Sequence, residues 1–162
     1  MIILSVEFKP KLGLQKEYIA KTIEINHNIK LCLCKFVKRL YKKEENIIIT
    51  DDYEKLEELD KLLWSFEQNS FLPHKIYSNG DAIDTPIILL SIQNLDKLRL
   101  FNDYTSIINN YDNALVNLEN NINIYEFVDT DESKKSISRN KFLEYKKNNF
   151  TLMHNKYNEQ TI

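Results

Sequence analysis

Hydrophobic residues follow two different spacings in the first half of the chain. Short apolar runs predict strands at Tyr18–Ile25 and Asn46–Thr50, and the second run is typical of a strand buried on both faces. Apolar residues three or four positions apart predict a helix from Ile29 to about Lys43 and another over Tyr53–Phe66, capped by one of the two preceding aspartates. Strands alternating with helices indicate parallel strands joined by right-handed crossovers.

The second half contains more strands and one long helix. We expect the predicted Pro86–Ile92 strand to be central and the predicted Asn121–Val128 strand to end the sheet, before a helix from Ser133 to about Asn149. The Asn-rich segment 102–120 indicates only a short helix. The remaining predicted segments are strands at Ser70–Tyr77 and Lys97–Phe101, the helix at Ala114–Leu118, a strand-forming run at Met1–Phe8 and a tail at Thr151–Ile162.

The length of 162 residues indicates one domain. The predicted fold is therefore a single-domain, Rossmann-like α/β sheet, mostly parallel and flanked by helices. Gly13 and Gly80 are the only glycines, and they are too far apart to form a phosphate-binding loop. We therefore expect the fold without a nucleotide-binding glycine loop.

Charge and cysteine content argue against several classes of protein. A net charge of −2 gives no whole-molecule attraction to nucleic acid or to anionic membranes. Cys32 and Cys34 lack the spacing and the partners of a zinc site, and we interpret them as small apolar residues of a helix. Without a disulfide framework, a signal peptide or a membrane span, we expect a soluble, cytoplasmic protein that binds no metal.

Catalytic motifs are absent from the sequence. Neither G-x-S-x-G nor H-E-x-x-H occurs, and the three histidines lie in unrelated contexts. We predict no catalytic residue and no cofactor. An α/β enzyme stays open as an alternative, and it would need a deep pocket lined by titratable groups.

The last predicted helix carries an unusual row of side chains. Its spacing places Ile137, Lys141 and Tyr145 on the side of the helix that faces the sheet. A second row, which contains one aromatic residue and three cations, lies on a different side of the helix. An aromatic ring among cations, beside Val128 at the end of the preceding strand, suits a peptide with an apolar tip and a carboxylate. Spacing alone favours an ordinary solvated helix with a buried ring, and direct binding of single-stranded nucleic acid is a further alternative. We call this second row the cationic stripe: Lys135, Arg139, Phe142 and Lys146.

Trp64 and Phe71 lie at the corner between the second helix and the following strand. Exposed aromatic residues at such a corner would suit a partner protein, whereas position alone favours the core for both.

Two motifs carry a family resemblance. The pattern L-D-x-x-L-W…S-F-L-P-H at Leu59–His74 and the pattern R-x-x-F-x-x-Y-x-x-x-x-F-x-L at Arg139–Leu152 resemble the chi subunit of bacterial DNA polymerase III. This resemblance implies a non-catalytic, Rossmann-like accessory subunit. Its partners would be the acidic C-terminal tail of the single-stranded-DNA-binding protein and either the psi subunit or a helicase, so that it would contact nucleic acid only indirectly.

The resemblance also assigns roles to residues. It implies tail binding by Val128, Lys135 and Arg139, and it places Phe142 where the family often has Tyr. Leu143 stands where other members carry a Lys, which Lys146 or Lys147 would replace.

The same resemblance implies that Trp64 and Phe71 bind psi or a helicase. Because the family begins with a strand followed closely by a helix, residues 1–15 would be an N-terminal extension, 16–153 the domain and 154–162 a flexible tail. The protein would link single-strand-binding protein on DNA to the clamp loader or to a helicase.

Overall fold

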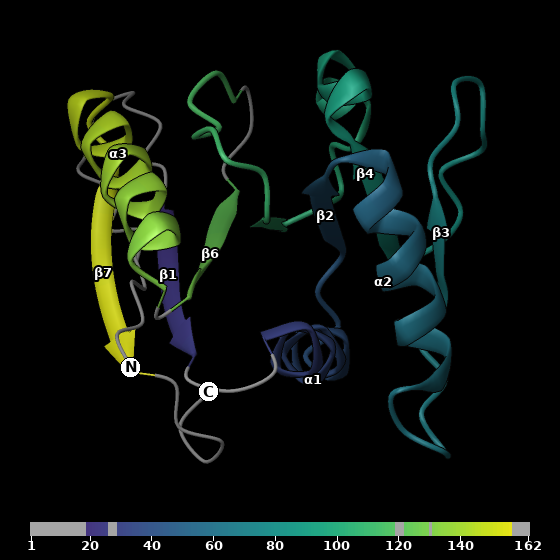
Figure 1. Ribbon diagram of the computed structural model, residues 1–162. Helices are drawn as coiled ribbons and strands as arrows, with labels where there is room; N and C mark the ends of the chain where they lie inside the picture. The colour runs from purple at the N-terminus through teal and green to yellow at the C-terminus, as the bar shows by residue number, and fades with distance from the viewer. Residues whose placement is uncertain (1–18, 26–28, 119–121, 130, 157–162) are drawn as a thin grey trace.

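The computed structural model describes residues 19–25, 29–118, 122–129 and 131–156. Strands and helices alternate along this part of the chain, except that β4 follows β3 and β6 follows β5 without a helix between them (Figure 1). The strands are β1 (Ile19–Ile25), β2 (Ile47–Asp51), β3 (His74–Ile76), β4 (Ile87–Ser91), β5 (Ser106–Asn109), β6 (Asn123–Asp129) and β7 (Thr151–Lys156). The helices are α1 (Ile29–Lys42), α2 (Tyr53–Ser65), the 3-10 helix η1 (Ile92–Leu100) and α3 (Glu132–Lys147).

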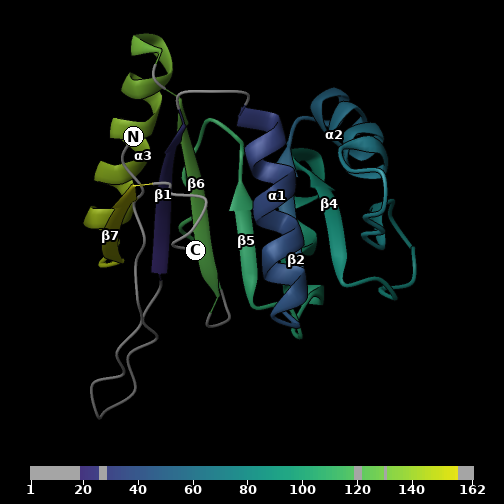
Figure 2. The same ribbon diagram turned by 90° about the horizontal axis from the view of Figure 1, so that it is seen from below.

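The seven described strands form one open sheet in the order β3-β4-β2-β5-β6-β1-β7. Each pair of neighbours is parallel. Figure 2 shows the sheet from below, with α1 lying in front of β2. The predicted Rossmann-like α/β fold with a mostly parallel sheet is confirmed.

The direction of each crossover decides which face its helix covers. The chain moves toward β3 through α1 and α2, and it moves back toward β7 through η1 and α3. Right-handed crossovers in opposite directions place helices on opposite faces. The core agrees, because Ile47 and Ile49 pack with α1 and α2, whereas Ile48 packs with Phe101 and Tyr145 on the other face.

Two predicted elements in the second half are wrong. Lys97–Phe101 was expected to be a strand, but residues 97–100 belong to η1, and Ser91 caps this helix by accepting a hydrogen bond from the backbone N–H of Gln93 at 3.4 Å. Ala114–Leu118 is irregular rather than helical. The Asn-rich segment instead contains β5, which was not predicted. The predicted central strand β4 is interior but lies next to the edge strand β3.

The chain after α3 returns to the sheet. Asn149 adopts a left-handed φ of 61°, which asparagine tolerates, and Phe150 donates its N–H to the Tyr145 carbonyl at 3.0 Å. The chain then forms β7, with Thr151 opposite Ile19 of β1. The predictions of a tail from Thr151 and of β6 as the last strand are therefore wrong. The predicted strand at Met1–Phe8, the extension at residues 1–15 and residues 157–162 lie outside the described residues.

No helix in the described part of the chain has the length and apolar character needed to cross a membrane.

Candidate protein-binding surfaces

Local sequence fixes where α3 begins. Asp131 is the N-cap, and its carboxylate accepts hydrogen bonds from the backbone N–H groups of Ser133 and Lys134, at 2.9 and 3.3 Å. Lys146 and Lys147 occupy the last turn, where cations suit the helix dipole. Lys141 and Tyr145 are buried toward the sheet, as their spacing predicts, whereas Ile137 is only half-buried.

The cationic stripe lies on the next side of the same helix. The Arg139 side chain is 69% exposed, and its Nη2 atom lies 3.9 Å from a Glu132 carboxylate oxygen. Lys135 Nζ lies 2.8 Å from the other Glu132 oxygen, and Lys146 is exposed. Such exposed ion pairs contribute little to stability, so an incoming carboxylate can displace Glu132 at small cost.

The aromatic member of the stripe is half-buried and faces β7. The Phe142 ring packs on the core beneath α3, and its centroid lies 5.5 Å from that of His154. Partial burial lowers the pKa of His154 below its ordinary value, so this ring is mostly neutral at pH 7. Sequence reasoning missed His154 because the segment that carries it was predicted to be a tail.

Val128 lies on the face of the sheet that α3 covers. In β6 the rings of Tyr125 and Phe127 contact Phe36 of α1, at centroid distances of 4.8 and 5.5 Å, whereas Ile124 and Glu126 face α3. Because side chains alternate along a strand, Val128 shares the face of Glu126. The structure therefore places Val128, half-buried, on the side of the sheet that carries the stripe.

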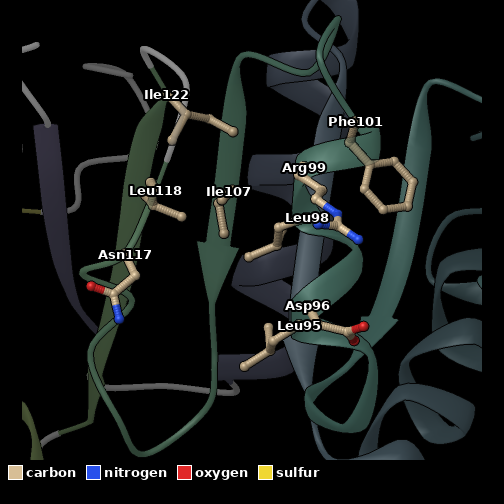
Figure 3. A pocket seen from close by; sticks show the side chains of 9 residues that line it. All are labelled: Leu95, Asp96, Leu98, Arg99, Phe101, Ile107, Asn117, Leu118 and Ile122. Atoms are coloured by element: carbon tan, nitrogen blue, oxygen red, sulfur yellow. The ribbon is translucent and has the colours of Figure 1, made fainter.

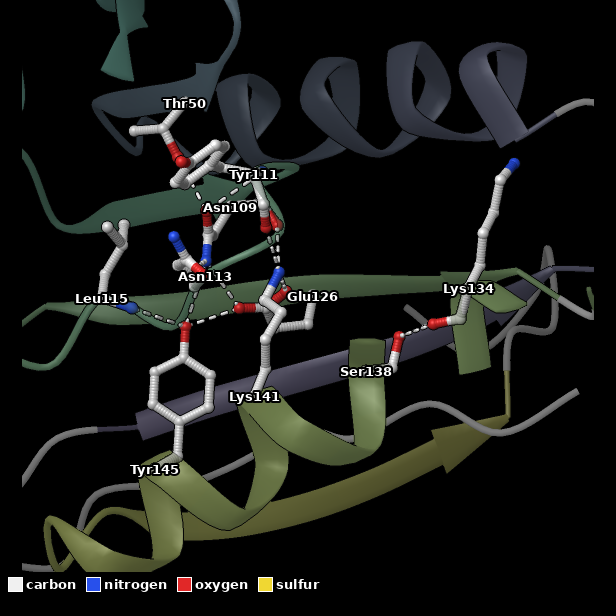
Figure 4. A network of polar contacts seen from close by, with 10 residues as sticks. All are labelled: Thr50, Asn109, Tyr111, Asn113, Leu115, Glu126, Lys134, Ser138, Lys141 and Tyr145. Atoms are coloured by element: carbon white, nitrogen blue, oxygen red, sulfur yellow. Dashed lines mark hydrogen bonds and ion pairs between the residues drawn. The ribbon is translucent and has the colours of Figure 1, made fainter. Parts of the chain in front are cut away.

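A buried polar network lies under α3, and no sequence pattern indicated which residues would meet in it (Figure 4). Lys141 forms an ion pair with Glu126 and also donates to the backbone carbonyls of Asn109 and Tyr111, at 3.2 and 2.6 Å. The Tyr145 hydroxyl donates to Glu126 at 2.5 Å, and the Asn109 amide donates to the same oxygen at 2.9 Å. The network thus joins α3 to the end of β5 and to the middle of β6.

Burial controls the ionisation of this network. It raises the pKa of Glu126 above its ordinary value, while Lys141, Tyr145 and Asn109 act in the opposite direction. Burial and the neighbouring carboxylate also raise the pKa of Tyr145 well above its ordinary value, which keeps the hydroxyl protonated as a donor. These groups satisfy one another, which indicates a structural role rather than a catalytic one.

The aromatic corner, formed by Trp64 and Phe71, is on the surface. Trp64 is 52% exposed and Phe71 is 68% exposed, so the core position that the residues alone favoured is wrong for both. Their ring centroids lie 5.6 Å apart, and Trp64 also packs on the buried His74 ring at 4.7 Å. His74 is fixed by its Nδ1 atom, which lies 2.6 Å from the Leu72 carbonyl oxygen. Exposed, mutually packed aromatic rings are typical of protein interfaces.

A cavity of about 240 Å³ separates η1 from the segment that leads into β6 (Figure 3). Leu98, Leu118 and Ile122 surround it, and Ile107 of β5 forms its base. Asp96 and Arg99 are the charged residues that line it, and Asp96 pairs with Lys97 at 2.6 Å. A cavity of this kind does not offer the convergent titratable groups that an enzyme site needs.

The cysteine, histidine and acidic side chains of the described residues do not form a metal site. Burial raises the pKa of Cys34 to about 12, so its thiol is protonated and a poor ligand. Within residues 29–118, 122–129 and 131–154, no group of three or more His, Cys, Asp or Glu side chains converges on a point where a metal could bind.

Most of the chain matches a known family. The family model of the DNA polymerase III chi subunit, HolC, matches residues 22–153. The chain belongs to the DNA polymerase III chi subunit family. The match spans both candidate surfaces, from Trp64 and Phe71 to the cationic stripe, and it includes the buried network. No curated protein sequence matches the chain significantly.

Membership in the chi family gives the protein an accessory role in the bacterial replisome. It is a subunit of the DNA polymerase III holoenzyme and has protein partners there. Its identity was expected from the two sequence motifs, and that expectation is confirmed.

Proposed function

We propose that this chi-family protein is a non-catalytic adaptor that binds the acidic C-terminal tail of single-stranded-DNA-binding protein. The observation that carries the proposal is the exposed Arg139 guanidinium, whose Nη2 atom lies 3.9 Å from the nearest oxygen of its ion-pair partner, the exposed Glu132. A guanidinium binds a terminal carboxylate through two parallel hydrogen bonds. Lys135 and Lys146 flank it and attract the acidic residues that precede the terminus.

The apolar end of the tail would rest beside Phe142. This ring is held by the core and by His154, so it offers an ordered apolar surface next to the cations. Val128, at the end of β6, adds apolar area on the same face of the sheet. Leu143, which is 60% exposed, stands where other members carry a lysine. We assign to Lys146 the attraction of the acidic tail that this lysine would otherwise supply.

A second partner would bind the aromatic corner. Trp64 and Phe71 belong to the end of the sheet formed by β3 and β4, whereas α3 covers the end formed by β6, β1 and β7 (Figure 1). The two surfaces therefore do not overlap, and both can be occupied at once. We assign the corner to the psi subunit or to a helicase, so that the protein would link single-strand-binding protein on DNA to the clamp loader or to that helicase in the cytoplasm.

Fluorescence anisotropy with a labelled acidic peptide that ends in Phe tests the tail site. We expect saturable binding at low salt, weaker binding as salt rises, and a loss on the order of 2 kcal/mol or about 30-fold for Arg139→Ala. Arg99→Ala is the matched control, because Arg99 is an exposed arginine on η1. A peptide with an amidated C-terminus should bind as poorly as the Arg139 variant does.

Two outcomes would overturn the tail site. One is no saturable binding at low salt, and the other is an equal effect of Arg139→Ala and Arg99→Ala. A bare single-stranded oligonucleotide belongs in the same titration, since salt-dependent binding to it without the binding protein would favour direct nucleic-acid recognition by α3.

The aromatic corner needs a separate measurement. Wild type, Trp64→Ala and Phe71→Ala should all bind the tail peptide equally, because the corner lies at the other end of the sheet. In a pull-down from the native organism, both variants should lose clamp-loader subunits or a helicase while keeping single-strand-binding protein. Unchanged capture of every partner by both variants would remove the corner from the proposal.

A further inference from the structure

A second cavity opens at the carboxyl ends of β2, β5 and β6. Its volume is about 440 Å³, within the usual size range of small-molecule sites. The first turns of α1 and α2 and the part of α3 from Lys134 to Lys141 line it. No residue of the cationic stripe lines it, and neither does Trp64 or Phe71. The cavity is therefore separate from both proposed protein-binding surfaces.

The topology of the sheet explains why the cavity lies there. After β2 the chain turns toward the β3 edge through α2, whereas after β5 it continues toward β6. Connections that leave neighbouring parallel strands in opposite directions leave a crevice at their carboxyl ends, which is where open α/β sheets bind ligands. Asp51 ends β2 and Asn109 ends β5, and both line the cavity.

The lining combines an apolar base with paired charges of both signs. Five apolar side chains contribute from α1, α2, β6 and α3: Ile29, Leu33, Leu59, Phe127 and Ile137. Lys55 Nζ lies 3.2 Å from an Asp51 oxygen on one side, and Lys134 Nζ lies 2.6 Å from an Asp129 oxygen on the other. Lys134 and Ser138 project from the same helix as Lys141, as Figure 4 shows.

These pairs can open to admit a ligand. The Lys55 and Lys134 side chains are 50% and 59% exposed, whereas their partners Asp51 and Asp129 are only 10% and 23% exposed. The two ammonium groups are therefore the members of these pairs that water already reaches and that a ligand carboxylate can approach. A ligand that carries one positive and one negative charge can pair with a carboxylate of one ion pair and an ammonium group of the other. The charges in the cavity then stay balanced. No glycine lines the cavity, and the close backbone approach that nucleotide phosphates need is therefore missing.

We propose that this cavity binds a small zwitterion with an apolar side chain, the chemical class of a free amino acid. Its ammonium group would bind the carboxylates of Asp51 or Asp129, and its carboxylate would bind Lys55 or Lys134. Its side chain would rest on the apolar base. A single small molecule suits a cavity of this volume, which three helices and the carboxyl ends of the strands line.

NMR titration of the labelled full-length protein with leucine and with phenylalanine tests this site. We expect saturable shifts in resonances of cavity residues, including Tyr111 and Ser138. Isocaproate and isoamylamine retain the apolar chain of leucine and one charge each. Because each loses a charge-assisted hydrogen bond, they should bind at least about tenfold more weakly than leucine.

Ser138→Phe places a ring in the cavity, and Ser136→Phe is the matched control on the exposed side of α3. Leucine binding should disappear in the first variant and persist in the second, with circular dichroism confirming that both are folded. If Ser138→Phe fails to fold, Lys134→Gln should still weaken leucine binding at least about fivefold, since it removes one charge-assisted bond.

Three results would overturn the proposal: no saturable shift with either amino acid, equal binding of leucine by the two phenylalanine variants, or equal affinity for leucine and a single-charge analogue. The tail-peptide titration should be unchanged in the Ser138 variant, so failure of this site is distinguishable from failure of the cationic stripe.

Discussion

Two neighbouring rows of side chains on α3 each contain lysine and aromatic residues, but one row is buried and the other lies on the outer side of the helix. Lys141 and Tyr145 point into the protein, and one position farther along, Phe142 and Lys146 belong to the cationic stripe. A rotation of about 100° per residue separates the two rows. The inner lysine is buried in an ion pair with Glu126, whereas the outer Lys135 pairs with the exposed Glu132.

The difference between the two rows shows which cationic side chains are able to bind an anion of a partner. Lys141 is committed to Glu126 and to two backbone carbonyls, so removing it from this network would leave a buried carboxylate without its cation. Lys135 and Arg139 share a carboxylate that water already screens. Only the outer row can therefore exchange its anion for a ligand at low cost, although both rows have lysines.

The largest expected effect comes from breaking the inner row. Lys141→Met should lower the free energy of unfolding by about 3 kcal/mol or more, because Glu126 would be left buried without its partner. Urea denaturation followed by circular dichroism measures the change. Lys147→Met, at the exposed end of the same helix, is the control and should stay within about 0.5 kcal/mol of wild type.

A double variant separates burial of charge from loss of packing. Glu126→Leu added to Lys141→Met removes the unpaired carboxylate, and part of the lost stability should return. Equal denaturation midpoints for Lys141→Met and Lys147→Met would contradict the structural role assigned to the inner row.

The sequence predicted the strongly periodic elements and failed where polar residues are buried. In α1 every buried residue is apolar, and in β2 the buried run Ile47–Ile49 is apolar, so the apolar pattern matches burial there. β5 is equally buried, yet its ends are Ser106 and Asn109. The Ser106 hydroxyl donates a hydrogen bond to Glu45, and the Asn109 amide donates one to Glu126 in the network under α3. Both partners are distant in the sequence. A hydrophobicity pattern cannot register burial that is stabilised by such bonds.

The candidate surfaces divide in the same way. The helical wheel correctly oriented Lys141 and Tyr145, because their orientation depends only on local geometry. Their partner Glu126 could not be inferred, since the sheet order brings β6 beneath α3. Trp64 looked like a core residue by type and is exposed, and the family motif rather than its chemistry pointed to a surface role.

A smaller effect is expected from a conservative change in the outer row. Arg139→Lys keeps the charge but loses the planar fork, so affinity for the acidic peptide should fall by about 1 kcal/mol, roughly fivefold. Fluorescence anisotropy measures the change against Arg99→Lys, which should bind as wild type does. Undiminished binding by Arg139→Lys would show that a point charge is sufficient and that no bidentate contact forms.

The smallest effect is the titration of the two glutamates that face the two rows. Burial raises the pKa of Glu126, whereas Lys135 and, more weakly, Arg139 lower the pKa of Glu132. The contribution of Glu132 to stability is therefore present above its unfolded pKa and is lost as pH falls through its folded pKa. Glu126 behaves oppositely, since its contribution declines as pH rises from its unfolded to its folded pKa.

Carboxyl-detected NMR can follow both glutamates in one pH titration. Salt at about 1 M shortens the screening length to about 3 Å, so the pKa of Glu132 should return toward its ordinary value. The pKa of Glu126 should stay raised, because its shift arises chiefly from burial, which salt does not relieve. If salt moved both pKa values equally, the two rows would share one electrostatic environment, and the distinction between a committed and an exchangeable lysine on α3 would fail.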